Sequence, residues 1–126
     1  MSDAAPPFNT VAWFQISTDT PDVAKSFYGD LFGWRFAPDD AIGGYEMITY
    51  AGADKPSGGL TTPDGGHPKG AIFNVLVRNV PAVCAEAEQQ GGKVHVPPTT
   101  TPDGLVFAEL TDPTGNTFGV FTPPAG

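Results

Sequence analysis

Two amides and two carboxylates stand inside stretches that are otherwise apolar and typical of strands. Gln15 lies in VAWFQIST, Asn74 in AIFNVLV, Glu46 in YEMITY and Glu109 in LVFAELT. Polar side chains in such stretches either bond the backbone or serve as the few polar groups of a ligand site. The amides could hydrogen-bond a ligand, and the carboxylates could pair with an ammonium group or work as an acid–base pair.

The first of these side chains belongs to a strand, residues 11–18, that leads into a helix. Thr20 can cap the helix, Pro21 suits its first position, and Gly33 is the expected left-handed stop. Apolar residues recur every four positions along it and form one stripe: Val23, Phe27 and Leu31.

The same order of elements recurs 59 positions later. A strand at 71–77 leads to Asn79 as cap, and a helix then ends at Gly92. Further short strands are predicted at 35–37, 45–50 and 58–62 in the first half, and at 94–96, 105–111 and 117–122 in the second. Each half is therefore β-α-β-β-β, and we expect one domain over residues 1–126, with modules at about 8–62 and 71–126 joined by a linker at about 63–70.

Composition limits the classes of function. The chain has 126 residues and is 40% hydrophobic, enough for one packed domain. A net charge of −8 with only six Lys and Arg argues against nucleic acid as a partner and favours cationic ligands. Cys84 is the only cysteine, so no internal disulfide can form. Neither a signal peptide nor a membrane-length apolar run is evident, which predicts a soluble cytoplasmic protein without a membrane partner.

Several motifs resemble the vicinal oxygen chelate superfamily, which includes glyoxalase I, extradiol dioxygenases and bleomycin resistance proteins. They are WFQIST followed by FYGDLFGW, then VPAVCAEAEQQGGKV, VPP and DPTGNTFGVF, and they extend from Val11 to Pro123. The resemblance implies an α+β fold. Two tandem βαβββ modules form a curled mixed sheet around a cleft, with the helices outside. This fold hosts several chemistries, so the resemblance is weak evidence for any one function.

Active members of that superfamily bind a divalent metal through His, Gln or Glu on the first and last strands of each module. Those positions fall on Trp13 and Ile72, and on Leu60 and Gly119, each pair 59 apart. None of the four side chains can donate to a divalent cation. We therefore expect no metal and no other cofactor.

The implied cleft wall follows from strand alternation, because residues two apart share a face. It mixes aromatic and aliphatic surface with two amides and two carboxylates, a composition that suits a small organic ligand. The predicted ligand-binding residues are Trp13, Gln15, Glu46, Ile48, Tyr50, Leu60, Ile72, Asn74, Phe107, Glu109, Gly119 and Phe121, with Trp34, Phe36 and His95 as a rim.

These features predict a metal-independent binding protein of the bleomycin-resistance kind, which sequesters an aromatic compound, either cationic or neutral, and has no catalytic residue. One alternative is an enzyme of the same fold, a glyoxalase-like lyase, isomerase or dioxygenase. It would be metal-free or use a displaced metal site, and it would work through Glu46, Glu109, Gln15 and His95. A partner-binding module without a ligand is the third interpretation. Exposed strand edges and the resemblance together favour a homodimer.

Overall fold

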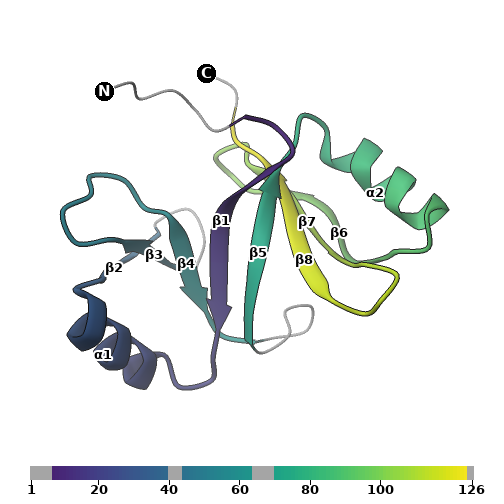
Figure 1. Ribbon diagram of the computed structural model, residues 1–126. Helices are drawn as coiled ribbons and strands as arrows, with labels where there is room; N and C mark the ends of the chain where they lie inside the picture. The colour runs from purple at the N-terminus through teal and green to yellow at the C-terminus, as the bar shows by residue number, and fades with distance from the viewer. Residues whose placement is uncertain (1–6, 40–43, 64–69, 125–126) are drawn as a thin grey trace. The chain divides into compact units, whose positions relative to one another are not determined.

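The chain forms two successive β-α-β-β-β sets (Figure 1). The computed structural model describes residues 7–39, 44–63 and 70–124, so most of the expected linker lies outside the described residues. The elements are β1 (Thr10–Ser17), α1 (Pro21–Phe32), β2 (Arg35–Pro38), β3 (Glu46–Thr49), β4 (Gly58–Thr61), β5 (Gly70–Leu76), α2 (Val80–Gln89), β6 (Lys93–Thr100), β7 (Val106–Thr111) and β8 (Thr117–Thr122). The predicted α+β class and the repeated element order are confirmed.

Two compact units divide the chain. One consists of Trp13–Ile72, and the other combines Met1–Ala12 with Phe73–Gly126. We refer to them as the first and second units. Neither helix is long and apolar enough to cross a membrane, as judged over the described residues.

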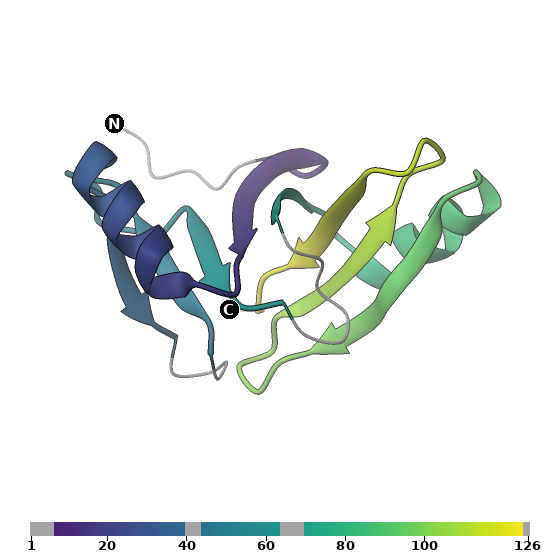
Figure 2. The same cartoon turned by 90° about the horizontal axis from the view of Figure 1, so that it is seen from below.

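The first unit has the strand order β2-β3-β4-β1. β1 runs parallel to β4, whereas β3 is antiparallel to both β2 and β4, which makes this a mixed set of strands. Figure 2 shows α1 running beside these strands. The predicted helix stop is confirmed, because Gly33 has φ 72° and its N–H donates to the Gly29 carbonyl at 2.9 Å. Thr20 stands at the N-cap position, but its side chain makes no capping bond.

Helix α1 exposes much of its apolar stripe. Val23, Phe27 and Leu31 remain 66%, 56% and 57% exposed, and no residue of the helix is fully buried. The helix is held instead by aromatic contacts, because Tyr28 stacks on Trp34 with ring centroids 5.2 Å apart. An exposed apolar stripe of this kind often marks a contact surface.

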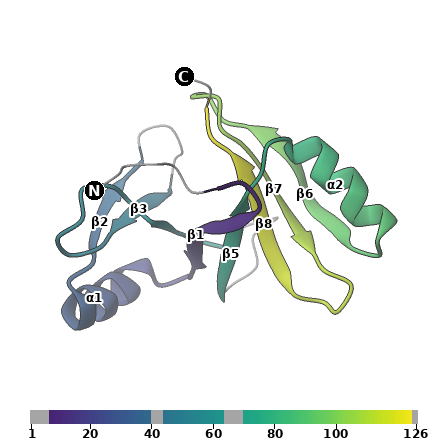
Figure 3. The same cartoon turned by 45° about the horizontal axis from the view of Figure 1, so that its top comes forward.

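The second unit has the strand order β5-β8-β7-β6, again mixed, with β5 parallel to β8. Helix α2 packs on one face of these strands (Figure 3). The buried core between them comprises Val77, Val80, Cys84, Ala108, Leu110 and Val120. Burial raises the pKa of the Cys84 thiol, as suits a small apolar core residue.

The ends of α2 are close to those predicted. The Asn79 side chain accepts from the Ala82 N–H at 3.0 Å, which confirms the predicted cap. The left-handed residue after the helix is Gly91, with φ 98°, and not Gly92. Gly92 follows it and donates its N–H to the Ala87 carbonyl at 2.9 Å. The predicted stop was therefore one residue late.

β2 is the first strand in the order of the first unit, and β6 is the last strand in the order of the second unit. β2 has only four residues and finishes at Pro38. β6 contains Pro97 and Pro98, and its register against β7 shifts twice, between Val94 and Val96 and again between Val96 and Thr99. Proline removes a backbone donor, and a register shift interrupts the hydrogen-bond ladder.

Candidate functional site

The face of the second unit opposite α2 carries two rows of side chains. Directly paired residues on neighbouring strands share a face. Gly119 on β8 pairs with Asn74 on β5 and with Glu109 on β7, which sets an amide and a carboxylate on either side of a residue without a side chain. We call these three residues the polar row.

In the polar row, Asn74 is half-buried and the other two residues are buried. Glu109 is 3% exposed, and Gly119 is buried as well. The Asn74 side chain lies over Gly119, since a Cβ built on that glycine would come within 1.9 Å of Asn74 Oδ1. The Asn74 Nδ2 atom is itself buried, and it has no hydrogen-bond partner among the described residues. A buried donor without a partner costs about 1–3 kcal/mol, a cost that native structures rarely bear without a reason.

An aromatic row lies next to the polar row on the same face. Phe121 pairs with Phe107 on β7 and with Leu76 on β5, two positions along each strand from the polar row. That spacing is about 7 Å along a strand. Both phenylalanines are half-buried, whereas Leu76 is buried. A buried carboxylate and amide next to two partly accessible rings can hold a small molecule by its polar and its apolar part at once.

The strand pairing brings five residues of the predicted site onto this face of the second unit. Asn74, Gly119, Glu109, Phe107 and Phe121 all lie on it. Ile72, the last residue of the first unit, lies two residues before Asn74 and alternates with it along β5. Their roles in ligand binding remain a proposal.

The first unit has a corresponding face, opposite α1. Gln15 on β1 and Met47 on β3 both pair with Gly59. The Trp13 indole N–H donates to the Tyr45 hydroxyl at 2.9 Å, and Tyr45 covers Gly59, whose Cβ would come within 1.9 Å of that hydroxyl. Trp13 and Gln15 were predicted on this face. Tyr45 and Met47 were missed, because they follow from a pairing register that no local pattern reveals.

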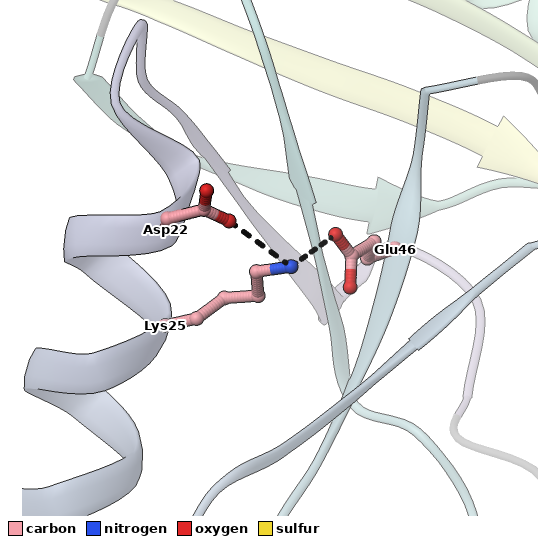
Figure 4. Close-up of polar contacts among 3 residues, drawn as sticks. All are labelled: Asp22, Lys25 and Glu46. Carbon is pink, nitrogen blue, oxygen red and sulfur yellow. Dashed lines mark hydrogen bonds and ion pairs between the residues drawn. The ribbon is translucent and has the colours of Figure 1, made fainter.

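Glu46 was predicted on the ligand-facing side, and this prediction was wrong. Its carboxylate Oε2 is 2.9 Å from Lys25 Nζ on α1, while Asp22 lies 3.7 Å from the same ammonium (Figure 4). The hydrogen bond to Glu46 raises the pKa of Lys25. Glu46 therefore helps to tie α1 to β3, and its charge is already matched.

Five other predicted site residues also lie on the α1 side. Ile48 and Leu60 are fully buried, on the same face of β3 and β4 as Glu46. Tyr50 and Trp34 have ring centroids 5.6 Å apart and belong to an aromatic cluster with residues of α1, and Phe36 pairs with Ile48. The corrected residues are thus Glu46, Ile48, Tyr50, Leu60, Trp34 and Phe36.

The wrong side-chain orientation predicted for β3 and β4 has one physical cause. Gln15 and Asn74 are equivalent at a shift of 59, but their partners Gly59 and Gly119 are 60 apart, and Met47 and Glu109 are 62 apart. A displacement of one or three residues turns every side chain of a strand to the opposite face. A constant shift of 59 therefore placed β3 and β4 of the first unit the wrong way round.

His95 stays a peripheral residue. It is exposed on β6, and its Nε2 hydrogen-bonds the Thr111 hydroxyl. Thr111 lies two positions beyond Glu109 on β7, on the side away from the aromatic row. Its predicted place in the rim remains an expectation.

A shallow pocket of about 300 Å³ lies elsewhere in the second unit, between the end of α2 and the turn after β7. Its polar lining includes Glu86 and Asp112. Asp112 is already engaged, because its carboxylate accepts from the N–H groups of Thr114 and Asn116 at 2.9 and 3.0 Å. Backbone and hydroxyl hydrogen bonds from Asn116 and Thr114 lower the pKa of Asp112 to about 2. The Asp112 carboxylate stabilises the turn after β7. The face with the polar and aromatic rows is therefore the better candidate for a ligand site.

The side chains at the superfamily's metal positions do not fit a metal. With the register corrected, those positions are Trp13 and Ile72 on the first strands, and Gly59 and Gly119 on the last. None offers a donor atom, and both glycines are covered by a neighbouring side chain. Over residues 7–39, 44–63 and 70–124, no three His, Cys, Asp or Glu side chains are grouped so that they could hold a metal ion.

Curated relatives provide one comparison with known proteins. The chain is 30% identical over 115 residues to "Putative glyoxylase CFP32" of Mycobacterium bovis and of Mycobacterium tuberculosis. The match covers 90% of this chain but only 44% of each relative. The chain thus spans less than half the length of these two relatives.

Solved structures support the same fold. A glyoxalase/bleomycin resistance protein/dioxygenase superfamily member from Vibrio splendidus 12B01 has TM-score 0.61 at 14% identity, over 87% of this chain and 96% of that one. A methylmalonyl-CoA epimerase variant from Streptomyces coelicolor, in complex with 2-nitronate-propionyl-CoA, has TM-score 0.62 at 16% identity, over 94% of this chain and all of that one. At such identities the likeness concerns the fold alone.

The family model for "Glyoxalase/Bleomycin resistance protein/Dioxygenase superfamily" matches residues 10–120, which include both β-α-β-β-β sets almost completely. Together with the element order and the pairing described above, this match shows that the chain belongs to that superfamily.

Proposed function

We propose that the chain binds a small organic molecule without a metal ion, at the face of the second unit that carries the polar and aromatic rows. The ligand is aromatic and bears a cationic or hydrogen-donating group. Binding without turnover would sequester the compound, as in relatives of the bleomycin-resistance kind, and an antibiotic or other toxic compound is the kind of ligand to expect.

The carboxylate of Glu109 carries this proposal. It is 3% exposed, and it lies beside two half-buried phenylalanines. A charge attracts an opposite charge far more strongly at that depth than in water. Glu46, the other candidate for pairing with a cation, is already bound to Lys25. On this face, Glu109 is the carboxylate that we propose to recognise a ligand, through its buried Oε1 atom.

Glu109→Gln tests this role with the shape of the side chain preserved. Against a panel of protonated aromatic amines, headed by benzylamine, calorimetry should show affinity falling at least about tenfold, or 1.4 kcal/mol. Glu88→Gln is the matched control, because Glu88 is an exposed carboxylate on α2 and its loss should leave affinity unchanged. Equal affinities in wild type and Glu109→Gln would contradict the proposal, as would a panel in which nothing binds.

A metal-free enzyme is the second candidate. Glu109 could accept a proton from a bound substrate while the buried Asn74 amide donates to its oxygen, a pairing suited to chemistry beside a carbonyl group. The relatives named as glyoxylases favour this reading. Elemental analysis of protein purified without added metal separates it from the displaced-metal alternative, since one zinc, nickel, iron or manganese ion per chain would support the latter.

We also propose a homodimer that uses the exposed stripe of α1. Light scattering should give about twice the 13.1 kDa of one chain. Phe27→Glu places a charge in the middle of the stripe and should shift the protein towards monomer, whereas Ser26→Glu, one position away and off the stripe, should not. A monomeric wild type, or a Phe27→Glu dimer as stable as the wild type, would rule out this surface.

A further inference from the structure

The Asn74 amide covers Gly119, one of the positions at which active members of the superfamily place a metal ligand. A side chain at 119 would displace this amide, because its first carbon would lie 1.9 Å from Asn74 Oδ1. Contacts below about 3 Å force a group to move. At this position the chain therefore has no ligand atom, and the Asn74 amide fills the space beside it.

The Asn74 amide and the Glu109 carboxylate together bear on what this face can bind. The Asn74 Nδ2 atom is buried and has no acceptor within the described chain. On the far side of Gly119, Glu109 places a buried carboxylate on the same face. The Cα atoms of Asn74 and Glu109 are two strand spacings apart, about 10 Å, and the residue between them, Gly119, has no side chain. A ligand bound at this face would meet the Asn74 donor and the Glu109 acceptor together.

We infer that the ligand carries a carbonyl oxygen next to an N–H or O–H group, as an aromatic carboxamide does. Asn74 Nδ2 donates to the carbonyl oxygen, the role a metal fills elsewhere, and Glu109 accepts from the neighbouring N–H or O–H. The ring packs on Phe107 and Phe121, one row along the strands. This inference rests on the proposed function and narrows its ligand from aromatic compounds with a cationic or hydrogen-donating group to those that also carry a neighbouring carbonyl oxygen.

A site built this way discriminates between ligands by the hydrogen bonds that each ligand can make to it. A ligand lacking the carbonyl leaves the Asn74 donor buried and unbonded, and one lacking the N–H leaves a carboxylate without that donor. Sites that hydrogen-bond a ligand group reject the analogue without it far more strongly than apolar sites reject a missing methylene. The positions of the ligand's hydrogen-bonding groups should therefore affect its affinity more than its size does.

Four probes of similar size separate the possibilities: benzamide, acetophenone, benzylamine and toluene. Titrations into ¹⁵N-labelled protein, followed at the Asn74 side-chain amide and the Gly119 backbone amide, should rank benzamide at least about tenfold tighter than toluene and acetophenone. A difference of that size corresponds to 1.4 kcal/mol. This ranking needs no variant, so it does not depend on any mutant folding.

Asn74→Asp removes the donor at constant shape and should weaken benzamide at least about tenfold. Asn79→Asp makes the same change at the cap of α2, where aspartate also caps well, and should leave binding unchanged. Benzamide binding no better than toluene, or equally well to a folded Asn74→Asp variant, would overturn the inference. Benzylamine binding alone would leave the proposed function standing, while failure of all four probes at millimolar concentration would overturn both.

Discussion

Replacing Trp34 with alanine should lower the free energy of unfolding by about 3 kcal/mol. Its ring has four aromatic neighbours, with centroids at 5.2 Å for Tyr28, 5.5 Å for Phe14 and Phe32, and 5.6 Å for Tyr50. Trp34 is half-buried, which places the loss at the lower end of the range for such truncations. Guanidinium unfolding followed by circular dichroism measures the change.

Phe73→Ala is the control for Trp34→Ala, because Phe73 lies outside the α1 stripe. Phe73 is 47% exposed and stacks on Phe118 with ring centroids 5.9 Å apart, so its loss should cost less than about 1 kcal/mol. Benzamide and benzylamine should bind Trp34→Ala as they bind the wild type, because Trp34 lies on the α1 side of its unit. Lost probe binding in a folded Trp34→Ala protein would restore Trp34 to the ligand rim.

Gly58→Ala should destabilise the chain by about 2 kcal/mol, the usual cost of overpacking a filled site. A Cβ at Gly58 would lie 2.5 Å from two atoms of the Phe14 ring. That ring cannot easily retreat, because it is stacked on Tyr50 at 6.2 Å and tilted against Trp34 at 5.5 Å. Thermal and denaturant unfolding should both register the loss.

Gly29→Ala makes the same substitution with the opposite expected sign. Gly29 lies inside α1, where the nearest atom to a new Cβ, the Trp34 carbonyl oxygen, is an ordinary 3.5 Å away. Alanine is favoured over glycine in a helix by about 1 kcal/mol, so this variant should be more stable than the wild type. A Gly58→Ala protein as stable as Gly29→Ala would mean that Phe14 has room to move.

Local sequence signals predicted the elements well, and long-range register limited the prediction of the site. Gly33 and Asn79 are terminators whose chemistry is local, and both behave as expected. Which face a strand presents depends instead on its partner. Asn74 and Glu109 were placed correctly because β5, β7 and β8 follow the alternation set at β5.

Two side-chain contacts in the first unit could not be predicted from the sequence. Nothing near Glu46 in the chain reveals that its partner is Lys25, 21 residues earlier and across the unit. The covering of Gly59 by Tyr45 is equally hidden, since it depends on a pairing register that differs between the two halves. Repeats identify equivalent elements, but insertions of odd length between them decide which way the side chains point.

The length, proline content and register of β2 and β6 affect how copies of this chain can associate. A foreign strand can extend a sheet only where an edge offers a long, regular row of free backbone donors and acceptors. The short β2 ends in proline, and the shifted β6 contains two prolines, so neither offers such a template. Growth into cross-β aggregates at these edges is therefore disfavoured, and self-association is left to side-chain surfaces such as that of α1.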